Sequence, residues 1–381
     1  MRITFLDLIP WDYDPGTPRR QPLGGSQSAL CHLAVALADL GHRVRLRNNV
    51  SSARTVQGVE CRPLAVPGMS ALHDTDVLVV LNELPAPLLA GLRQAAGDRI
   101  RIVLWTQHGC DQPAAQPLRD PRYRDQLDAL VLISGWQAET YINVLGLRPG
   151  IIRVHRNAPG PDYRQRWLER GGRIATKSWP PVLAYTSTPY RGLDLLLACF
   201  PAIRAAIPGT RLAVYSSMAT YFDATANDPF AELYAQCRSM PGVDYHGAIA
   251  QAELADAMQD VSCLAYPNLF AETSCVAAME AMAAGCLVVT SAFGALPETT
   301  AGFAVLVPPC ADRADHQAAF TQATIRALRR LTPGSVSRSA VLAQLEHEAR
   351  LTCEVFDWET RAREWQDMLT DLVAGPSPRP A

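Results

Sequence analysis

Short apolar runs alternate with helix-like segments along this chain, and that alternation constrains the fold more than any other feature. In the first half the runs are at 3–9, 42–48, 76–83, 99–108, 129–134 and 151–157. They are nearly continuous in apolar residues, which is typical of parallel strands covered by helices on both faces. Between the first two runs the pattern predicts a helix with Ser26 as its N-cap and Gly41 at its end.

The second half of the chain repeats this plan. Its predicted strands are 182–187, 211–217, 243–247, 262–267, 287–291 and 303–309, with helical patterns between them. Strand and helix in regular alternation predict α/β domains of the doubly wound class. At 381 residues the chain exceeds what one hydrophobic core usually supports, so we expect two such domains.

Turn-forming residues indicate where these domains begin and end. We expect an N-terminal domain over 1–175 and a C-terminal domain over 182–354. The stretch 158–181 has Pro-Gly-Pro near one end and Pro-Pro at the other, and it is predicted to contain the linker. After Pro309 only helices are predicted, at roughly 313–330, 335–352 and 355–373, followed by a disordered tail at 374–381.

Composition and charge exclude several classes of function. The formal net charge of -2 provides no electrostatic footprint for nucleic acid, so we expect no nucleic-acid partner. No run reaches the roughly 18 apolar residues of a membrane span, and the start lacks a leader pattern, so a cytoplasmic protein is expected. The basic stretch from Arg148 to Lys177 leaves peripheral membrane contact open, beside the simpler interpretation of a solvated face.

Cysteine and lysine usage narrow the chemistry further. The ten cysteines include no CxxC pair, so neither a structural zinc nor a disulfide framework is expected. Lys177 is the only lysine, which excludes a Walker A lysine and weakens any Schiff-base chemistry. If a side-chain cation binds phosphate here, it is therefore an arginine, whose guanidinium suits a diphosphate.

Two carboxylates stand out in FAETSCVAAMEAMAAGC, residues 270–286. Glu272 lies just before the predicted helix, at the carboxyl end of a strand, where doubly wound sheets bind ligands. The free backbone N–H groups of Ser274, Cys275 and Val276 would form a binding site for phosphate. Glu280 is surrounded by apolar neighbours and needs a buried partner, for which a hydroxyl-rich ligand is suitable. The simpler alternative is a helix whose dipole Glu272 complements, with Glu280 facing solvent.

These residues also carry a resemblance to a known family. The arrangement E-x7-E, followed by AMAAGCLVVTS and GALPE, resembles the donor-site signature of family 4 retaining glycosyltransferases over residues 264–298. The resemblance implies a GT-B fold, in which two Rossmann-like domains face each other across a cleft, and a helix at 355–373 that packs back on the N-terminal domain. It implies a nucleotide-diphosphate-sugar donor, no metal and no other cofactor. In such enzymes the first acid, here Glu272, lies near the transferred sugar and the second, here Glu280, binds the nucleotide ribose.

Further positions match the same family. In YTSTPYRGLDLLL, Arg191 stands where a diphosphate-binding lysine is usual. Thr186 and Ser187 occupy the region of a second arginine, and Ser187 is expected to bind the donor there. Read alone, Arg191 could equally be a surface charge beside a turn. Cys275 stands where many members have glycine, and it too departs from the pattern.

The N-terminal half contributes two matches. PLGGSQSAL resembles the family's glycine loop, in which Gly24 and Gly25 would let the backbone approach the donor closely. His108, at the end of the fourth predicted strand, matches a histidine that family members often carry near the donor sugar. Each has an ordinary alternative, a tight turn for the glycines and a structural histidine for His108.

We therefore expect a metal-independent, retaining glycosyltransferase. Arg191, the glycine loop and the helix after Glu272 would hold the diphosphate, while Glu272 and His108 would position the sugar. The acceptor would be a glycan, a lipid-linked compound or a small molecule. Two alternatives stay open, a catalytically silent sugar-nucleotide-binding partner subunit and a nucleotide-sugar epimerase on the same fold.

Overall fold

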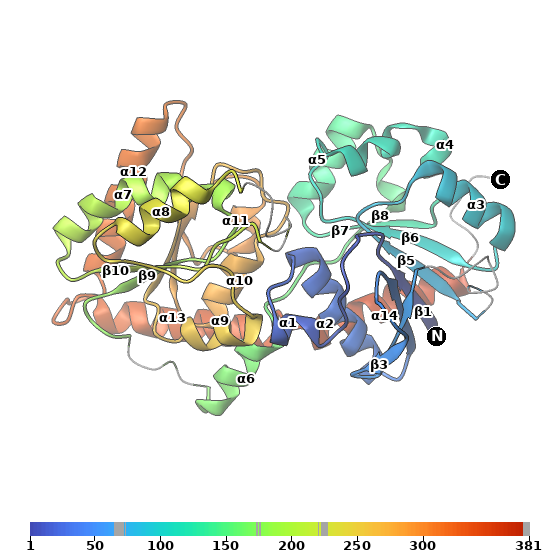
Figure 1. The fold of residues 1–381 in the computed structure, drawn as a ribbon, viewed down its shortest axis with the longest axis horizontal. Coiled ribbons are helices and arrows are strands. Elements are labelled where there is room, and N and C mark those ends of the chain that lie inside the picture. The colour runs from blue at the N-terminus through green and yellow to red at the C-terminus, as the bar shows by residue number, and fades with distance from the viewer. Residues whose placement is uncertain are drawn as a thin grey trace. The chain divides into compact units, whose positions relative to one another are not determined.

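The structure is a computed structural model that describes residues 1–64, 72, 74–172, 174, 177–219, 221 and 228–375. These residues form two compact units. The first comprises Met1–Pro18, Gly25–Ala158 and Trp358–Ala381, and the second comprises Arg19–Gly24 and Pro159–Asp357. Both are α/β units built on a mainly parallel sheet, as the apolar runs predict (Figure 1).

The first unit contains an eight-stranded sheet in the order β3-β4-β2-β1-β5-β6-β7-β8. Every neighbouring pair is parallel except β3 and β4, which are antiparallel. The strands are β1 (Arg2–Leu6), β2 (Arg43–Asn48), β3 (Arg54–Val56), β4 (Val59–Pro63), β5 (Val77–Leu81), β6 (Arg101–Trp105), β7 (Ala129–Leu132) and β8 (Ile152–Val154).

Helices cover both faces of this sheet because successive strand side chains point to opposite faces. Leu104 lies in a core cluster with residues of α3 (Ala86–Ala96) and α5 (Gly135–Leu145). On the other face, α2 (Gly25–Asp39) and α14 (Trp358–Ala374) lie side by side (Figure 1). There the ring of Trp365 packs edge-on against Trp105 at 5.1 Å between centroids.

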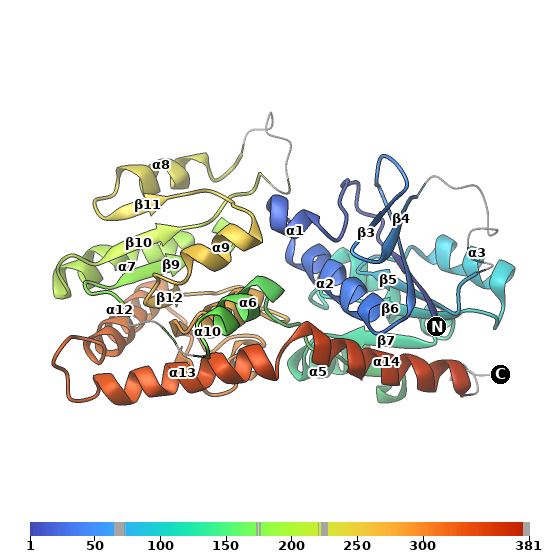
Figure 2. The same cartoon turned by 90° about the horizontal axis from the view of Figure 1, so that it is seen from below.

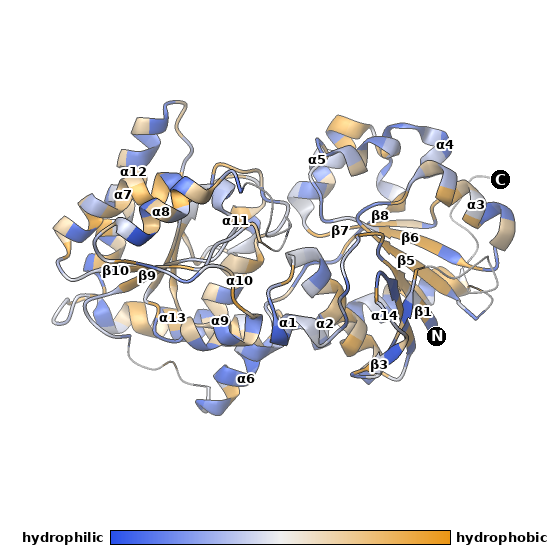
Figure 3. Cartoon of the chain, in the orientation of Figure 1, coloured by the Kyte–Doolittle hydropathy of each residue, from blue (hydrophilic) through white to orange (hydrophobic). Residues whose placement is uncertain are grey.

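The second unit contains a six-stranded parallel sheet in the order β11-β10-β9-β12-β13-β14. Its strands consist mainly of apolar residues, several of which are coloured as hydrophobic in Figure 3. They are β9 (Val182–Tyr185), β10 (Arg211–Val214), β11 (Val243–Tyr245), β12 (Cys263–Tyr266), β13 (Leu287–Ser291) and β14 (Val305–Val307).

Two layers of helices enclose this second sheet, as Figures 1 and 2 show. One layer holds α7 (Leu193–Ala206), α8 (Ala231–Ser239) and α12 (Arg313–Arg329). The other holds α9 (Gln251–Ala257), α10 (Val276–Ala283) and α13 (Arg338–Glu354). The remaining helices are the short elements α1 (Thr17–Arg20), η2 (Pro113–Arg119), α4 (Pro121–Arg124), η3 (Pro149–Ile151), α6 (Pro161–Glu169), η4 (Pro189–Arg191) and α11 (Leu296–Thr299).

Several sequence expectations differ from the structure in detail. Helix α2 begins at Gly25, so Ser26 is its second residue and not its cap. The predicted linker contains helix α6, and the chain enters the second unit at Pro159. The predicted tail lies outside the described residues from 376 onward.

The hairpin of β3 and β4 has no counterpart among the predicted strands. Its two-residue turn consists of Gln57, at φ 49°, and Gly58, at φ 78°. Such paired positive φ angles match the right-handed twist of a tight hairpin. The two strands are short and polar, so the apolar runs do not reveal them.

Candidate functional site

The strand order of the second unit marks where a ligand site belongs. The crossovers from β9 run outward in one direction and those from β12 in the other, so the order reverses between these two neighbouring strands. Doubly wound sheets bind ligands outside the carboxyl ends of the strands at such a reversal. The loop after β9 carries Arg191, and the loop after β12 carries Glu272.

Arg191 and Glu272 meet at this point. Nη1 of Arg191 lies 2.7 Å from each carboxylate oxygen of Glu272. The Glu272 side chain is only 2% exposed and that of Arg191 is 27% exposed. A charge-assisted pair that is this well shielded from water holds both side chains in one geometry.

Tyr266, the last residue of β12, completes this network. Its hydroxyl donates a hydrogen bond of 2.5 Å to Oε1 of Glu272, and Ser187 Oγ lies 3.3 Å from the same hydroxyl. The Tyr266 side chain is buried in the core. Glu272 therefore has three hydrogen bonds that fix its carboxylate at the strand edge.

Two glycines allow the loops to pack closely around this network. Gly192 adopts φ +107°, and a Cβ there would lie 2.5 Å from the carbonyl oxygen of Pro267. Gly294 adopts φ +61°, and a Cβ there would lie 2.6 Å from both the N and the O of Glu272. Both positions require glycine on conformational and steric grounds. The loop after β13 thus packs against the backbone of Glu272.

The Arg191 guanidinium also contacts two aromatic rings. It lies 4.6 Å from the ring centroid of Phe270 and 5.5 Å from that of Tyr190. Its Nε is buried and has no hydrogen-bond partner among the described residues. Because Glu272 uses only Nη1, the guanidinium retains N–H groups for an anionic ligand.

The start of α10 lies beside this pair in the sequence and presents a helix N-terminus without a side-chain cap. Cys275 occupies the N-cap position and makes no capping hydrogen bond. Burial raises the pKa of its thiol, which is therefore neutral. Ser274 Oγ is buried and has no partner in the described structure. Uncapped N–H groups and an unused hydroxyl are suited to phosphate oxygens.

Glu280, one turn from the end of α10, has a separate partner. Gln251 Nε2 donates a hydrogen bond of 2.7 Å to Oε1 of Glu280. Burial raises the pKa of Glu280 to about 7, an effect that the Gln251 hydrogen bond only partly offsets. The alternative of a solvent-facing Glu280 is therefore wrong. The structure places Glu272 and Glu280 in two hydrogen-bond networks and does not join them.

The first unit has a comparable reversal of strand order, between β1 and β5. Asp7 follows β1 and Glu83 follows β5, and both interact electrostatically with His108, which follows β6. Asp7 is buried and accepts hydrogen bonds from the Tyr13 hydroxyl at 2.7 Å and from Gln27 Nε2 at 3.1 Å. Acids and a histidine thus gather at the carboxyl edge of this sheet.

His108 is held by hydrogen bonds to its backbone carbonyl, and one of its ring nitrogens has no hydrogen-bond partner among the described residues. Its carbonyl oxygen accepts hydrogen bonds from Gln137 Nε2 at 2.8 Å and from the Tyr141 hydroxyl at 3.0 Å. Its Nδ1 is buried and has no partner among the described residues. Burial lowers the pKa of His108, so the neutral ring is favoured, although Glu83 and Asp7 act in the opposite direction.

The glycine loop divides between the two units. Gly24 is buried and belongs to the second unit, whereas Gly25 begins α2 in the first. A Cβ on Gly25 would meet no atom within 4 Å. Neither glycine has a positive φ, so the backbone conformation does not require glycine at either position.

In the basic stretch from Arg148 to Lys177, the last residue does not face solvent. Lys177 is buried, and its Nζ donates to the carbonyl oxygens of Gln259 at 3.2 Å and Ala284 at 2.9 Å. In the described part of the chain, no helix combines the length and apolarity of a membrane span. Likewise, its His, Cys, Asp and Glu side chains form no group of three that could hold a metal ion. All ten cysteines are free.

Sequence reasoning missed Tyr266, Gln251 and Asp7. Tyr266 ends an apolar strand and is therefore indistinguishable from a core aromatic. Gln251 is the first residue of α9, a position that has no pattern of its own. Asp7 had a usable signal, since it is an acid at the carboxyl end of the first predicted strand.

Comparison with known proteins finds a family match over part of this chain. Residues 180–330, which contain Arg191, Glu272 and Glu280, match the family model described as Glycosyl transferases group 1. The match lies within the second unit of the structure. The chain is similar to the GDP-mannose-dependent alpha-(1-6)-phosphatidylinositol monomannoside mannosyltransferase of Mycolicibacterium smegmatis, at 29% identity over 252 residues. That match covers 60% of this chain and 61% of the length of its relative.

Solved structures show that this chain has a GT-B fold. Sucrose-phosphate synthase from Thermosynechococcus elongatus matches with a TM-score of 0.64 at 18% identity, over 98% of this chain and 100% of the other. Anabaena HepE in complex with UDP matches with a TM-score of 0.64 at 16% identity, over 97% of this chain and 100% of the other. At such identities the likeness concerns the fold alone.

Proposed function

We propose that this protein is a retaining glycosyltransferase that transfers a sugar from a nucleotide-diphosphate-sugar to an acceptor without a metal ion. The observation that carries the proposal is the contact of Arg191 with Glu272 at the reversal point of the second sheet, inside the matched domain. One residue supplies cationic N–H groups and the other a carboxylate, as a sugar diphosphate requires.

In the proposed mechanism the diphosphate binds Arg191, Ser274 and the uncapped start of α10. These groups stabilise the negative charge that develops on the leaving oxygen as its bond to the sugar C1 breaks. The acceptor oxygen bonds to C1 on the same face, and its proton passes to the departing phosphate oxygen. Glu272 accepts hydrogen bonds from sugar hydroxyls, and Glu280 accepts them from the ribose. The roles of His108 and of Gly24 and Gly25 stay predictions from the resemblance.

The curated relative is named for GDP-mannose, so GDP-mannose is the first donor to test. UDP-, ADP- and dTDP-sugars complete the panel, and each is measured by thermal stabilisation and by slow donor hydrolysis. We expect one nucleotide class to stabilise the protein, and we expect Arg191→Gln to abolish that stabilisation. Arg313→Gln, which removes an exposed arginine of the same unit, should leave it unchanged.

The same panel separates the alternatives. Binding without hydrolysis or transfer would favour a silent sugar-nucleotide-binding subunit. Conversion of the donor to an epimer would favour an epimerase. Absence of binding by every nucleotide sugar would refute the donor site itself.

A further inference from the structure

One face of the first sheet carries a row of arginines beside the carboxyl ends of β2 and β4. Arg43, Arg45 and Arg47 alternate along β2, so their side chains share one face. In the register with β4, Arg45 is opposite Glu60 and Arg47 is opposite Arg62. We call Arg45, Arg47, Glu60 and Arg62 the arginine cluster.

The charges on this face are balanced at the amino ends of the strands. There Arg2 pairs with Asp74 and Asp76, and Arg43 pairs with Asp74. Arg45 Nε lies 3.2 Å from Oε2 of Glu60, and its Nη2 lies 3.8 Å from Oδ2 of Asp74. These residues form an ordinary network of surface ion pairs.

Toward the carboxyl ends of β2 and β4, the positive charges are no longer matched by carboxylates. Arg62 uses the second oxygen of Glu60, with its Nε 2.8 Å from Oε1, so both carboxylate oxygens are occupied. Arg47 has no ion pair in the described structure, and its Nε and Nη1 are buried without a hydrogen-bond partner. Burial, and then the nearby charges of Arg45 and Arg62, lower the pKa of Arg47.

An unpaired guanidinium with buried N–H groups is costly, and an anionic ligand would offset that cost. The arginine cluster holds three cations and one carboxylate, which leaves an excess of two positive charges. A phosphate ester with a charge near −2 neutralises that excess, whereas a carboxylate supplies only about one charge. Guanidinium groups also bind phosphate oxygens in a bidentate manner.

The position of the cluster connects it with the sheet edge where ligands bind. Arg47 is the penultimate residue of β2, and its carbonyl oxygen accepts a hydrogen bond of 3.0 Å from the backbone N–H of Asp7. Asp7 belongs to the group that faces His108 at the reversal of strand order. A phosphate at Arg47 would therefore lie along the same carboxyl edge of the first sheet.

We propose that Arg47 and Arg62 form an anion subsite that binds a phosphate group of the acceptor. With such a subsite the acceptor is a phosphate ester, either a soluble sugar phosphate or a phospholipid headgroup. The inference rests on the proposed transferase function for its biological meaning. The subsite itself can be tested without a donor.

The test uses inorganic phosphate as the probe, titrated calorimetrically into the full-length protein at constant ionic strength. We expect saturable binding that Arg47→Gln weakens about tenfold or more, the effect of losing hydrogen bonds to a charged group. Without phosphate, Arg47→Gln should unfold at a higher temperature than the wild type, because an unpaired buried cation is removed. Arg43→Gln removes a paired arginine from the same face and should bind phosphate within about twofold of the wild type.

Arg62→Gln provides a second variant that should also weaken phosphate binding, so the test does not depend on one substitution. Phosphate binding that Arg191→Gln abolishes and Arg47→Gln leaves intact would place the anion at the donor site and overturn the subsite. That result would leave the transferase proposal standing. Absence of nucleotide-sugar binding, with Arg47-dependent phosphate binding retained, would instead overturn only the transferase proposal.

Two further arms distinguish the source of the phosphate. Glucose 6-phosphate that binds in an Arg47-dependent manner would indicate a soluble acceptor. Binding to phosphatidylcholine vesicles that contain phosphatidylinositol, reduced by Arg47→Gln, would indicate a headgroup. The proposal would be overturned if Arg47→Gln bound inorganic phosphate, glucose 6-phosphate and the phosphatidylinositol vesicles as well as the wild type does.

Discussion

Nη1 of Arg191 is shared equally between the two carboxylate oxygens of Glu272, at 2.7 Å from each. The two residues are 81 positions apart in the chain, and adjacent strands bring them together. In the ligand-free protein the acid therefore neutralises the cation that would bind the diphosphate. In the proposed mechanism an incoming diphosphate would compete with Glu272 for Arg191, and its binding would free that carboxylate for sugar hydroxyls.

Replacing Arg191 should therefore impair both stability and donor binding. Arg191→Gln leaves the buried Glu272 carboxylate with Tyr266 alone, and we expect a loss of about 3 kcal/mol in the free energy of unfolding. Urea denaturation measures this loss. The matched change Arg313→Gln breaks an exposed pair with Asp194 and should cost under about 1 kcal/mol. Equal losses in the two variants would contradict the assignment.

Tyr266→Phe tests whether the tyrosine positions Glu272. Removing the hydroxyl deletes the 2.5 Å hydrogen bond but keeps the ring in the core. We expect kcat to fall about tenfold, with a smaller change in the donor KM, because the carboxylate loses its orientation. Tyr123→Phe, which removes a hydrogen bond to the Leu84 carbonyl in the first unit, should leave kcat unchanged. A fall in both variants would indicate a purely structural effect.

Donor affinity should depend on pH through Glu280. Its pKa of about 7 means that the carboxyl is protonated in mildly acidic solution and ionised in alkaline solution. Ribose hydroxyls donate hydrogen bonds, and the ionised form accepts them better. Donor affinity measured by calorimetry should thus rise from about pH 6 to about pH 8, and Glu280→Gln should flatten that rise. Glu253→Gln, an exposed acid on α9, serves as the control.

The burial of Glu348 predicts that the stability of the folded protein depends on pH. Glu348 is buried on α13, its Oε1 has no partner in the described structure, and burial raises its pKa to about 8. Between about pH 4.5 and pH 8 the folded chain holds a proton that the unfolded chain has released. This burial therefore makes the folded state progressively less stable as pH rises through that window.

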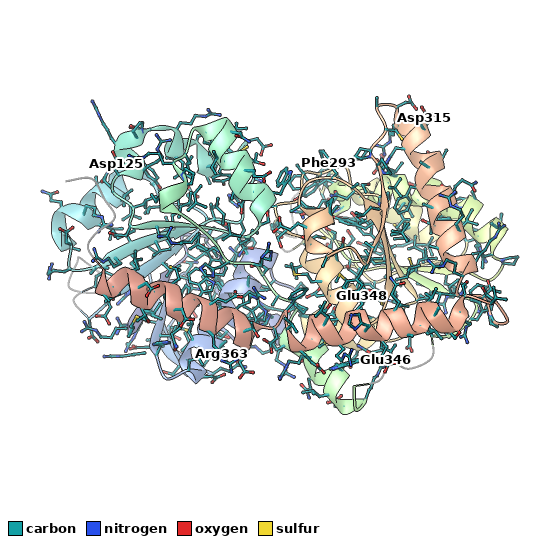
Figure 4. All side chains as sticks on the ribbon, turned by 180° about the vertical axis from the view of Figure 1, so that it is seen from behind. Asp125, Phe293, Asp315, Glu346, Glu348 and Arg363 are labelled. Atoms are coloured by element: carbon teal, nitrogen blue, oxygen red, sulfur yellow. The ribbon has the colours of Figure 1, made fainter. Side chains whose placement is uncertain are left out.

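Glu348→Gln should remove this penalty, which is on the order of 5 kcal/mol above pH 8. Thermal unfolding should show the variant and the wild type converging near pH 4 and diverging as pH rises. Glu346 lies two residues away, on the exposed side of the same helix, as Figure 4 shows. Glu346→Gln should follow the wild type at every pH. A divergence that is the same at all pH values would contradict the prediction.

The sequence alone determines much of the architecture. Each predicted run overlaps a strand of one of the two sheets, because parallel strands covered on both faces are rich in apolar residues. Short polar strands such as β3 and β4 leave no such pattern. The positions of Arg191 and Glu272 after strand ends, and of Glu280 within the following helix, also follow from the sequence, with the help of a family resemblance.

Only the tertiary structure decides which side chains meet. Contacts between Arg191 and Glu272, between Gln251 and Glu280, and between Lys177 and two backbone carbonyls depend on strand order and helix packing. No local pattern encodes them, since each joins residues from different elements. For the same reason, the sequence does not distinguish Arg47 from the other arginines of β2. The missing partner of Arg47 becomes visible only when β4 places another arginine opposite it.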